Sequence, residues 1–331
     1  MTTGWKKLRH RIEWIAVRAI DAVVPMLPRR AYLLLADIGG ALAYFLHVSG
    51  RQVAIENVDA AFGDDMSFAE KRRAVRRSYQ YFARAMGDLF WGRRLTRENL
   101  AQFVDVSALS EFIAAGGANR PVIFACPHYG GFEWIPFALA LHGIPSTVVT
   151  QSFKNPLLNG IFNGVREVGG IQTIRRERAI LRLYKALRSG RSIALAVDLT
   201  VSAKLPSVPI TCFGMQTCVT FAHAWLHRRT GAAILPAHCE PLADGRYRLV
   251  LHPMIEAAST TTDQQIAQAC WDCFEPMLRQ NPAPWLWMYK HWRYRPPNAG
   301  RQYPDYANES PHFRKLLART EKEKVVVATH V

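Results

Sequence analysis

The N-terminal part of the chain repeats apolar residues with the period of a helix. In residues 4–24 they recur every three or four positions, at Trp5, Leu8, Ile12, Ile15, Ala19 and Val23. Lysine and arginine occupy many of the positions between them. This pattern predicts a basic amphipathic helix of the kind that lies on an anionic membrane surface. A helix packed on its own domain would show the same periodicity, so both interpretations stand.

The next segment, residues 31–48, is almost wholly apolar and is flanked by arginines. As a single helix it would span about 27 Å, slightly less than the hydrocarbon core of about 30 Å. Asp37 and the Gly39–Gly40 pair interrupt the apolar run, so a segment embedded in one leaflet fits as well as a true crossing. Residues 1–66 are therefore predicted to form a membrane-associated helical region.

A long helix is predicted over residues 67–92, because Ser67 and Glu70 match a capping box at its start. One face of this helix is apolar, with Val75, Tyr79, Phe82, Met86 and Leu89. Basic residues cluster in its first turns, at Lys71, Arg72, Arg73, Arg76 and Arg77. Such a cluster is either a solvated face or a surface that meets phosphates.

From residue 121 onward the pattern changes to short apolar runs typical of strands. These runs cover residues 122–126, 146–150, 192–198, 208–213, 232–238 and 246–252. Helical patterns lie between several of them, near residues 156–168, 178–189 and 217–229. Strands that alternate with helices predict an α/β fold with a single mixed sheet flanked by helices. With no linker or repeat inside this part, residues 67–300 are predicted to form one catalytic domain, followed by a C-terminal tail over 301–331.

Composition narrows the choice of partners. A hydrophobic content of 49% excludes pervasive disorder and a protein with many membrane spans. The net charge of +16 favours polyanionic partners, namely nucleic acid, anionic lipid headgroups or an acidic carrier protein. The six cysteines form no framework, so we expect reduced, buried thiols, and we expect Cys270 and Cys273 to be two positions of one helix.

The candidate chemistry lies just beyond the apolar run 122–126. His128 follows it by two residues, and functional groups collect at the carboxyl ends of strands in open α/β sheets. Gly130 and Gly131 allow the chain to bend before Glu133. Glu133 would then accept a hydrogen bond from one imidazole nitrogen, which leaves the other as a general base, while backbone N–H groups at the bend would hold an oxyanion. Taken alone, the same spacing fits a structural histidine in a turn.

The stretch from His128 to Glu133 resembles the motif of the lysophospholipid acyltransferase superfamily, a histidine and an acid separated by four residues. With Glu as the acid and Gly in the gap, it is similar to the late acyltransferases of lipid A biosynthesis, the lauroyl and myristoyl acyltransferase type. Further segments that resemble this family are residues 51–64, 155–170, 186–198, 212–214 and 284–297.

The resemblance implies a glycerolipid-acyltransferase-like fold and a membrane-bound enzyme on the cytoplasmic side of the inner membrane. Such an enzyme transfers a fatty acyl chain from acyl carrier protein, or from acyl-CoA, directly to a hydroxyl of an anionic glycolipid, a lipid A precursor. It implies neither a cofactor nor a metal. Carried over, His128 is the base and Glu133 its orienting acid.

The other positions carried over from the family are expected to line the substrate site. They are Gly130, Gly131, Arg166 and Asp198. Arg166 suits either a phosphate or support of Glu133. Leu199 departs from the family, which usually has Gln after the Asp, and this puts the exact acceptor in doubt.

Several alternatives remain beside this interpretation. If the chain is an acyltransferase, the alternative to a lipid A precursor as acceptor is another lipid, such as a lysophospholipid or an amino-acid-containing lipid. A basic nucleic-acid-binding protein is the alternative outside enzymes, although no nucleic-acid module is recognised.

His223 and His227 have zinc-ligand spacing on a predicted helix, but packing is favoured for both. Cys126 is expected to be a core residue. Tryptophans 285, 287 and 292 fit a core or a membrane interface equally well.

Overall fold

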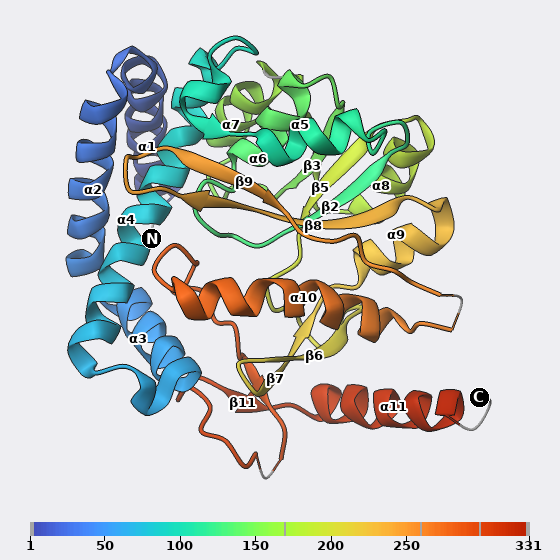
Figure 1. The fold of residues 1–331 in the computed structure, drawn as a ribbon. Helices are drawn as coiled ribbons and strands as arrows, with labels where there is room; N and C mark the ends of the chain where they lie inside the picture. Colours follow the sequence, from blue (N-terminus) through green and yellow to red (C-terminus); the bar gives the residue numbers. More distant parts are fainter. Residues whose placement is uncertain (1–2, 169, 259, 298, 329–331) are drawn as a thin grey trace.

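The computed structural model describes residues 3–168, 170–258, 260–297 and 299–328 (Figure 1). The helices are α1 (Thr3–Val23), α2 (Arg29–Leu46), α3 (Val48–Phe62), α4 (Phe68–Trp91), α5 (Ser107–Ala114), α6 (Trp134–Leu141), α7 (Leu157–Val168), α8 (Ala179–Arg188), α9 (Ala222–Thr230), α10 (Asp263–Gln280) and α11 (Pro311–Ala328). The strands are β1 (Val104–Asp105), β2 (Val122–Cys126), β3 (Ser146–Thr150), β4 (Gln172–Arg175), β5 (Ser192–Ala196), β6 (Val208–Cys212), β7 (Met215–Val219), β8 (Ala233–Pro241), β9 (Tyr247–Leu251), β10 (Tyr294–Arg295) and β11 (Asn308–Glu309).

Seven strands form the central sheet, in the order β1-β9-β8-β2-β5-β3-β4. Neighbouring strands run parallel except β8 and β9, which pair antiparallel. The sheet is therefore mixed, which confirms the predicted α/β class. Two small pairs lie apart from it, the antiparallel β6–β7 hairpin and the parallel β10–β11 pair.

Helices cover both faces of the sheet, as Figure 1 shows for α6 on one side and α10 on the other. Residues of a strand point alternately to the two faces, and β2 follows this rule. Ile123 and Ala125 join the core cluster that includes side chains of α8, α9 and α10. Phe124 and Cys126 join the cluster that includes side chains of α5, α6 and α7. Burial of β2 on both faces explains why its sequence is a continuous apolar run.

The N-terminal helices form a layer beside the sheet, where α2 packs along α4 (Figure 1). The capping box predicted from Ser67 and Glu70 is present at the start of α4. The helix predicted over 31–48 instead ends at Leu46, and the chain turns into α3. Within the described residues no single helix is long and apolar enough to cross a membrane; α2 and the stretch Val48–Asp65 meet that criterion only as a pair bent by 93°.

The outer surfaces of α1 and α2 carry many exposed apolar side chains. They include Trp5, Leu8, Ile12, Ile15, Leu34, Leu35, Ile38, Leu42, Phe45 and Leu46. The spacing of three and four predicted for the first helix is thus realised on its exposed side, instead of being packed against the protein. The opposite side of α1 packs against α7 and α4. Both interpretations of this helix, membrane surface and packed helix, therefore stay open.

Two predicted elements differ from the structure. Residues 217–219 were assigned to a helix but belong to β7, and the helix begins at Ala222. The prediction put residues 208–213 in the main sheet, whereas β6 forms a separate hairpin with β7. The three tryptophans of the C-terminal segment are almost completely buried. They therefore belong to the core and not to an interface.

Candidate functional site

Strand register brings His128 and Asp198 together. β2 and β5 are adjacent and parallel, and Cys126 pairs with Ala196 at their carboxyl ends. Both site residues lie two positions beyond this pair. The two short extensions therefore leave the sheet side by side at its carboxyl edge, where ligand sites of α/β folds are found.

Asp198 is the carboxylate that contacts the imidazole. Its Oδ1 lies 2.8 Å from Nδ1 of His128. Its Oδ2 accepts two further hydrogen bonds, from the backbone N–H of His128 at 2.8 Å and from Nε1–H of Trp285 at 2.9 Å. The Asp198 side chain is fully buried, whereas that of His128 is 19% exposed. This geometry fixes the proton on Nδ1 and leaves Nε2 as the basic nitrogen.

Glu133 faces a different partner from the one expected. Its two carboxylate oxygens pair with Arg166, at 2.6 Å from Nη2 to Oε1 and 3.1 Å from Nε to Oε2. The prediction that Glu133 accepts the imidazole hydrogen bond is therefore wrong in this structure. The physical reason is that Glu133 is the residue before α6, on the side toward α7, while Asp198 leaves the strand adjacent to β2. This ion pair is the contact expected if Arg166 supports Glu133.

The Gly130–Gly131 pair serves close backbone packing. Gly130 has φ of +54°, and a Cβ there would lie 2.1 Å from the carbonyl oxygen of Cys239. Its N–H donates to the carbonyl of Pro284, and that of Gly131 donates to the carbonyl of Cys239, both at 3.1 Å. These two N–H groups are occupied, so this arrangement gives no support to their expected role as oxyanion donors.

Electrostatics favour a basic imidazole at His128. Burial alone would lower the pKa of His128, but the Asp198 carboxylate, through its charge and its hydrogen bond, raises it above the ordinary value, with a smaller contribution from Glu133. Burial acts to raise the pKa of Asp198, and its interactions with His128 outweigh that effect and lower it. The pair therefore consists of an ionised Asp198 and an imidazole with increased affinity for a proton.

A cavity of about 700 Å³ opens at this pair. His128, Glu133 and Arg166 line one part of it. Its other walls are largely apolar and include Ile180, Leu183, Leu195, Leu199 and Val201. Exposed Lys154 and Arg176 also line it. A cavity of this size with an apolar wall, a few converging polar groups and cationic residues suits a ligand that has a long apolar part and an anionic group.

The remaining candidates have structural surroundings. Cys126 is buried, and burial raises the pKa of its thiol, which disfavours a thiolate nucleophile. His223 is buried, and burial lowers its pKa to about 4. His227 lies 2.9 Å from the carbonyl oxygen of Ala232 through Nδ1. No cluster of three or more potential metal ligands occurs in the part of the chain that the structure describes.

The sequence analysis did not predict that Trp285 contacts Asp198, and it predicted Asp198 only as a residue that lines the substrate site. Trp285 is 87 residues away from Asp198 and donates to it from a buried indole. One feature of the sequence pointed to the pair: Asp198 stands at the end of an apolar run, and His128 stands just after another. It did not say that these two runs are neighbours in the sheet.

Comparison with known proteins identifies the family of the chain. A phosphatidylinositol mannoside acyltransferase of Mycolicibacterium smegmatis is 28% identical over 224 residues, which are 66% of this chain and 72% of that protein. One of Mycobacterium tuberculosis is 26% identical over 286 residues, or 84% of this chain and 86% of that protein. The family model described as bacterial lipid A biosynthesis acyltransferase matches residues 1–294. Because that match covers most of the sequence, the chain is an acyltransferase and belongs to the bacterial lipid A biosynthesis acyltransferase family.

Proposed function

We propose that this acyltransferase moves a fatty acyl chain from a thioester, carried by acyl carrier protein or CoA, to a hydroxyl of an anionic glycolipid such as a lipid A precursor. The observation that carries the proposal is the His128–Asp198 pair at the edge of the cavity. Nδ1 is held by the carboxylate at 2.8 Å, so Nε2 is the nitrogen that acts on substrate. An oriented, basic imidazole beside an apolar cavity is what acyl transfer to an alcohol requires.

The reaction proceeds in one direct transfer. Nε2 of His128 takes the proton of the acceptor hydroxyl as its oxygen attacks the thioester carbonyl. The C–O bond forms, the C–S bond breaks, and the imidazolium returns its proton to the leaving thiolate. Asp198 stabilises the transient imidazolium. The buried, poorly ionised Cys126 thiol supports a mechanism without an acyl-enzyme.

Arg166 is the positioning cation of the site. Two of its five N–H groups are used by Glu133, which fixes the guanidinium at the cavity wall. In the proposed complex the others bind a substrate phosphate or the thioester carbonyl oxygen, where charge develops. Glu133 therefore acts through Arg166 and not through the imidazole.

The acceptor is an anionic, sugar-bearing lipid. The family description names lipid A, and the two relatives are named for phosphatidylinositol mannosides, so a glycolipid with a phosphate is common to both. The net charge of +16 and the cationic residues at the cavity are complementary to such an acceptor and to an acidic carrier protein. No nucleic acid is needed to explain the charge. A lysophospholipid or an amino-acid-containing lipid is the alternative acceptor.

We place the enzyme at the cytoplasmic side of the inner membrane. The exposed apolar side chains of α1 and α2, together with basic residues on α1, support attachment to an anionic lipid surface. Attachment would bring the lipid acceptor to the cavity without requiring it to leave the bilayer.

The test is an acyl-transfer assay on membranes that contain the full chain. The donors are thioesters of acyl carrier protein and of CoA whose acyl chain is labelled. The acceptors are a lipid A precursor, phosphatidylinositol mannosides and a panel of lysophospholipids. We expect label in a glycolipid, abolished by His128→Ala and retained by His312→Ala, which alters an exposed histidine on α11. Label that appears only in a lysophospholipid would contradict the glycolipid acceptor, and a fully active His128→Ala variant would contradict the mechanism.

A further inference from the structure

A basic surface runs from the end of β4 along α8. Between residues 175 and 188 the chain has six basic residues and one acidic residue, Glu177. All six basic side chains are exposed, and none of them takes part in an ion pair within the described residues. We call this set the α8 surface, and its members are Arg175, Arg176, Arg178, Arg182, Lys185 and Arg188.

The helix turns one face to the core and the other to solvent. Leu183, Ala186 and Leu187 are buried in the core. Leu181 and Lys185, four residues apart, share the exposed face. Leu181 is 57% exposed although it is a large apolar side chain. An exposed apolar contact surrounded by charged groups is the usual arrangement of a protein–protein interface.

The basic surface continues onto α9. Tyr184 of α8 and Trp225 of α9 pack with their ring centroids 6.3 Å apart. The guanidinium carbon of the exposed Arg229 lies 5.6 Å from the centroid of the Trp225 ring. Figure 1 shows α8 and α9 at the side of the molecule away from α1 and α2. The α8 surface is therefore separate from the apolar surface that is proposed to meet the membrane.

The first turns of α8 also form a wall of the cavity that His128 lines. Arg176 lines this cavity together with Ala179, Ile180 and Leu183 of α8. Arg176 thus belongs both to the cavity and to the α8 surface. One short helix has the reaction cavity on one side and the basic surface on the other. A partner bound on the exposed side of α8 therefore has a short path past Arg176 to the catalytic pair.

The spacing of the charges favours a protein partner over a nucleotide. From Arg178 to Arg188 the chain advances ten residues, or about 15 Å at the rise of an α-helix. The phosphates of a CoA molecule form a compact group, which meets only part of such a row. A partner helix with carboxylates along its length has the same rise and faces the whole row. Complementary charge of this kind also steers the two proteins together.

We propose that the α8 surface is the docking surface of an acidic acyl carrier protein, whose acyl-bearing arm enters the cavity past Arg176. Carboxylates of the carrier pair with the exposed cations of α8, and Leu181 supplies an apolar contact. This inference rests on the proposed acyl transfer, and it selects the carrier protein over CoA as the donor.

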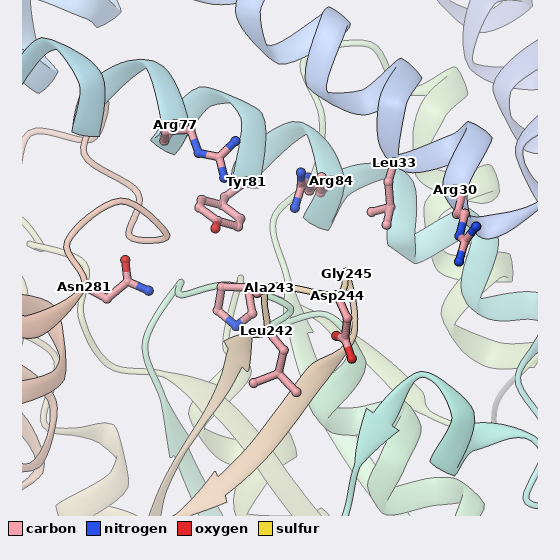
Figure 2. A pocket seen from close by; sticks show the side chains of 11 residues that line it. Arg30, Leu33, Arg77, Tyr81, Arg84, Leu242, Ala243, Asp244, Gly245 and Asn281 are labelled. Carbon is pink, nitrogen blue, oxygen red and sulfur yellow. The ribbon is translucent and has the colours of Figure 1, made fainter.

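A second basic region supplies the control. Arg30 of α2 and Arg77 of α4 are exposed and lie at opposite ends of a pocket of about 550 Å³ (Figure 2). Neither takes part in an ion pair within the described ranges. The residues that line this pocket are different from those that line the cavity at His128. These two arginines therefore match Arg182 and Lys185 in charge and exposure, but they lie outside the α8 surface.

The experiment measures binding of fluorescently labelled acyl carrier protein, with its phosphopantetheine arm unacylated, to the full chain in phosphatidylcholine nanodiscs. Fluorescence anisotropy is read at an ionic strength of about 0.15 M, where diffuse attraction is screened. One variant, Arg182→Glu/Lys185→Glu, reverses two charges of the α8 surface. A second, Leu181→Ala, removes the apolar contact without a change of charge. The matched control is Arg30→Glu/Arg77→Glu, and thermal denaturation checks that each variant is folded.

We expect the affinity for the carrier protein to fall about tenfold in Arg182→Glu/Lys185→Glu, given the usual strength of exposed charge pairs. It should fall about threefold in Leu181→Ala, because less apolar surface is buried. The control should stay within about twofold of the unaltered chain. Equal losses in the α8 variant and the control would overturn the proposal in favour of diffuse attraction. No detectable binding by the unaltered chain would also overturn it.

Acyl-transfer kinetics with the two donors separate this inference from the proposed function. In Arg182→Glu/Lys185→Glu the KM for acyl carrier protein thioesters should rise about tenfold, while the KM for acyl-CoA stays within about twofold. An equal rise for both donors would overturn the proposal in favour of a site for CoA. If the chain transfers acyl groups from acyl-CoA but does not bind the carrier protein, the inference fails and the proposed function stands. If it binds the carrier protein at α8 but transfers no acyl group, the proposed function fails and the docking surface stands.

Discussion

Replacing Asp198 by asparagine tests which carboxylate orients the catalytic imidazole. Oδ2 of Asp198 accepts two hydrogen bonds, from the His128 backbone and the Trp285 indole, and Oδ1 faces Nδ1 of His128. An asparagine side chain has one acceptor oxygen and one NH2 group. The oxygen will take the Oδ2 position, because two donors meet there. The NH2 group then faces Nδ1.

An amide donor at Nδ1 reverses the tautomer of His128. Nδ1 must accept, the proton moves to Nε2, and the base is lost. Turning the amide to restore the tautomer would leave two donors facing an NH2 group, at a cost of about 1–3 kcal/mol for each lost partner. In a serine protease triad the equivalent change lowers kcat about 10⁴-fold, which is a measured example from another enzyme. For Asp198→Asn we expect a loss of about 10³-fold in kcat, since the two lost partners correspond to roughly this factor.

The assay is single-turnover acyl transfer on membranes, with Glu133→Gln as the matched variant. Glu133→Gln weakens the pair with Arg166 but leaves the Asp198–His128 contact intact, so we expect a loss of only about tenfold. Thermal denaturation checks that both variants are folded. If Glu133→Gln is as inactive as His128→Ala while Asp198→Asn stays within about tenfold of the unaltered enzyme, the assignment of Asp198 is refuted.

Three further predictions concern the end of β2 and the loop that follows it. Since the pKa of His128 is raised above 6.5, kcat/KM should rise as the pH increases through that raised pKa and the imidazole loses its proton. The pH–rate profile of any residual activity of Asp198→Asn should have its midpoint at a lower pH. An unchanged midpoint would contradict the effect of the Asp198 charge. Gly130→Ala should lower the free energy of unfolding by about 2–4 kcal/mol, because its Cβ would clash with the Cys239 carbonyl at positive φ; chemical denaturation measures this, and a loss below about 0.5 kcal/mol would show that the loop yields. Cys126→Ser should keep kcat within about twofold, because the proposed mechanism forms no acyl-enzyme, and an inactive but folded variant would contradict direct transfer.

The elements that could be predicted are those whose pattern is decided locally. β2 is buried on both faces and has a continuous apolar run, and α4 begins at a capping box, so both were predictable. β4, with one buried position among its residues Gln172–Arg175, gave no such signal. β7 was read as the start of a helix because its pairing with β6 depends on a hairpin outside the main sheet. Pairing between distant segments is a tertiary property that periodicity does not carry.

The site shows the same division. The position of His128 after a strand was predictable from sequence, and so was the bend at Gly130. The partner of the imidazole was not, since the acid nearest in sequence is Glu133 and the acid nearest in space is Asp198. That choice is made by the order of strands, with β5 adjacent to β2. A motif of histidine and acid defines which residues are present, and the sheet decides which of them meet.

The N-terminal helices also take part in holding the site, which bears on how membrane attachment and catalysis are related. Trp285 orients Asp198, and the carbonyl of Trp285 accepts a hydrogen bond from Ser78 of α4. The side chain of Asn57 in α3 donates to the carbonyls of Trp287 and Tyr289, at 2.7 Å each. The tryptophan-rich segment is thus fixed between the catalytic pair and helices α3 and α4. α2, which carries many of the exposed apolar side chains, packs along α4. The surface proposed to meet the membrane is therefore connected through packed elements to Asp198, the carboxylate that contacts His128. Under the proposed membrane attachment, this packing would hold the cavity at a defined position relative to the lipid surface, which is what an enzyme needs when its acceptor stays in the bilayer.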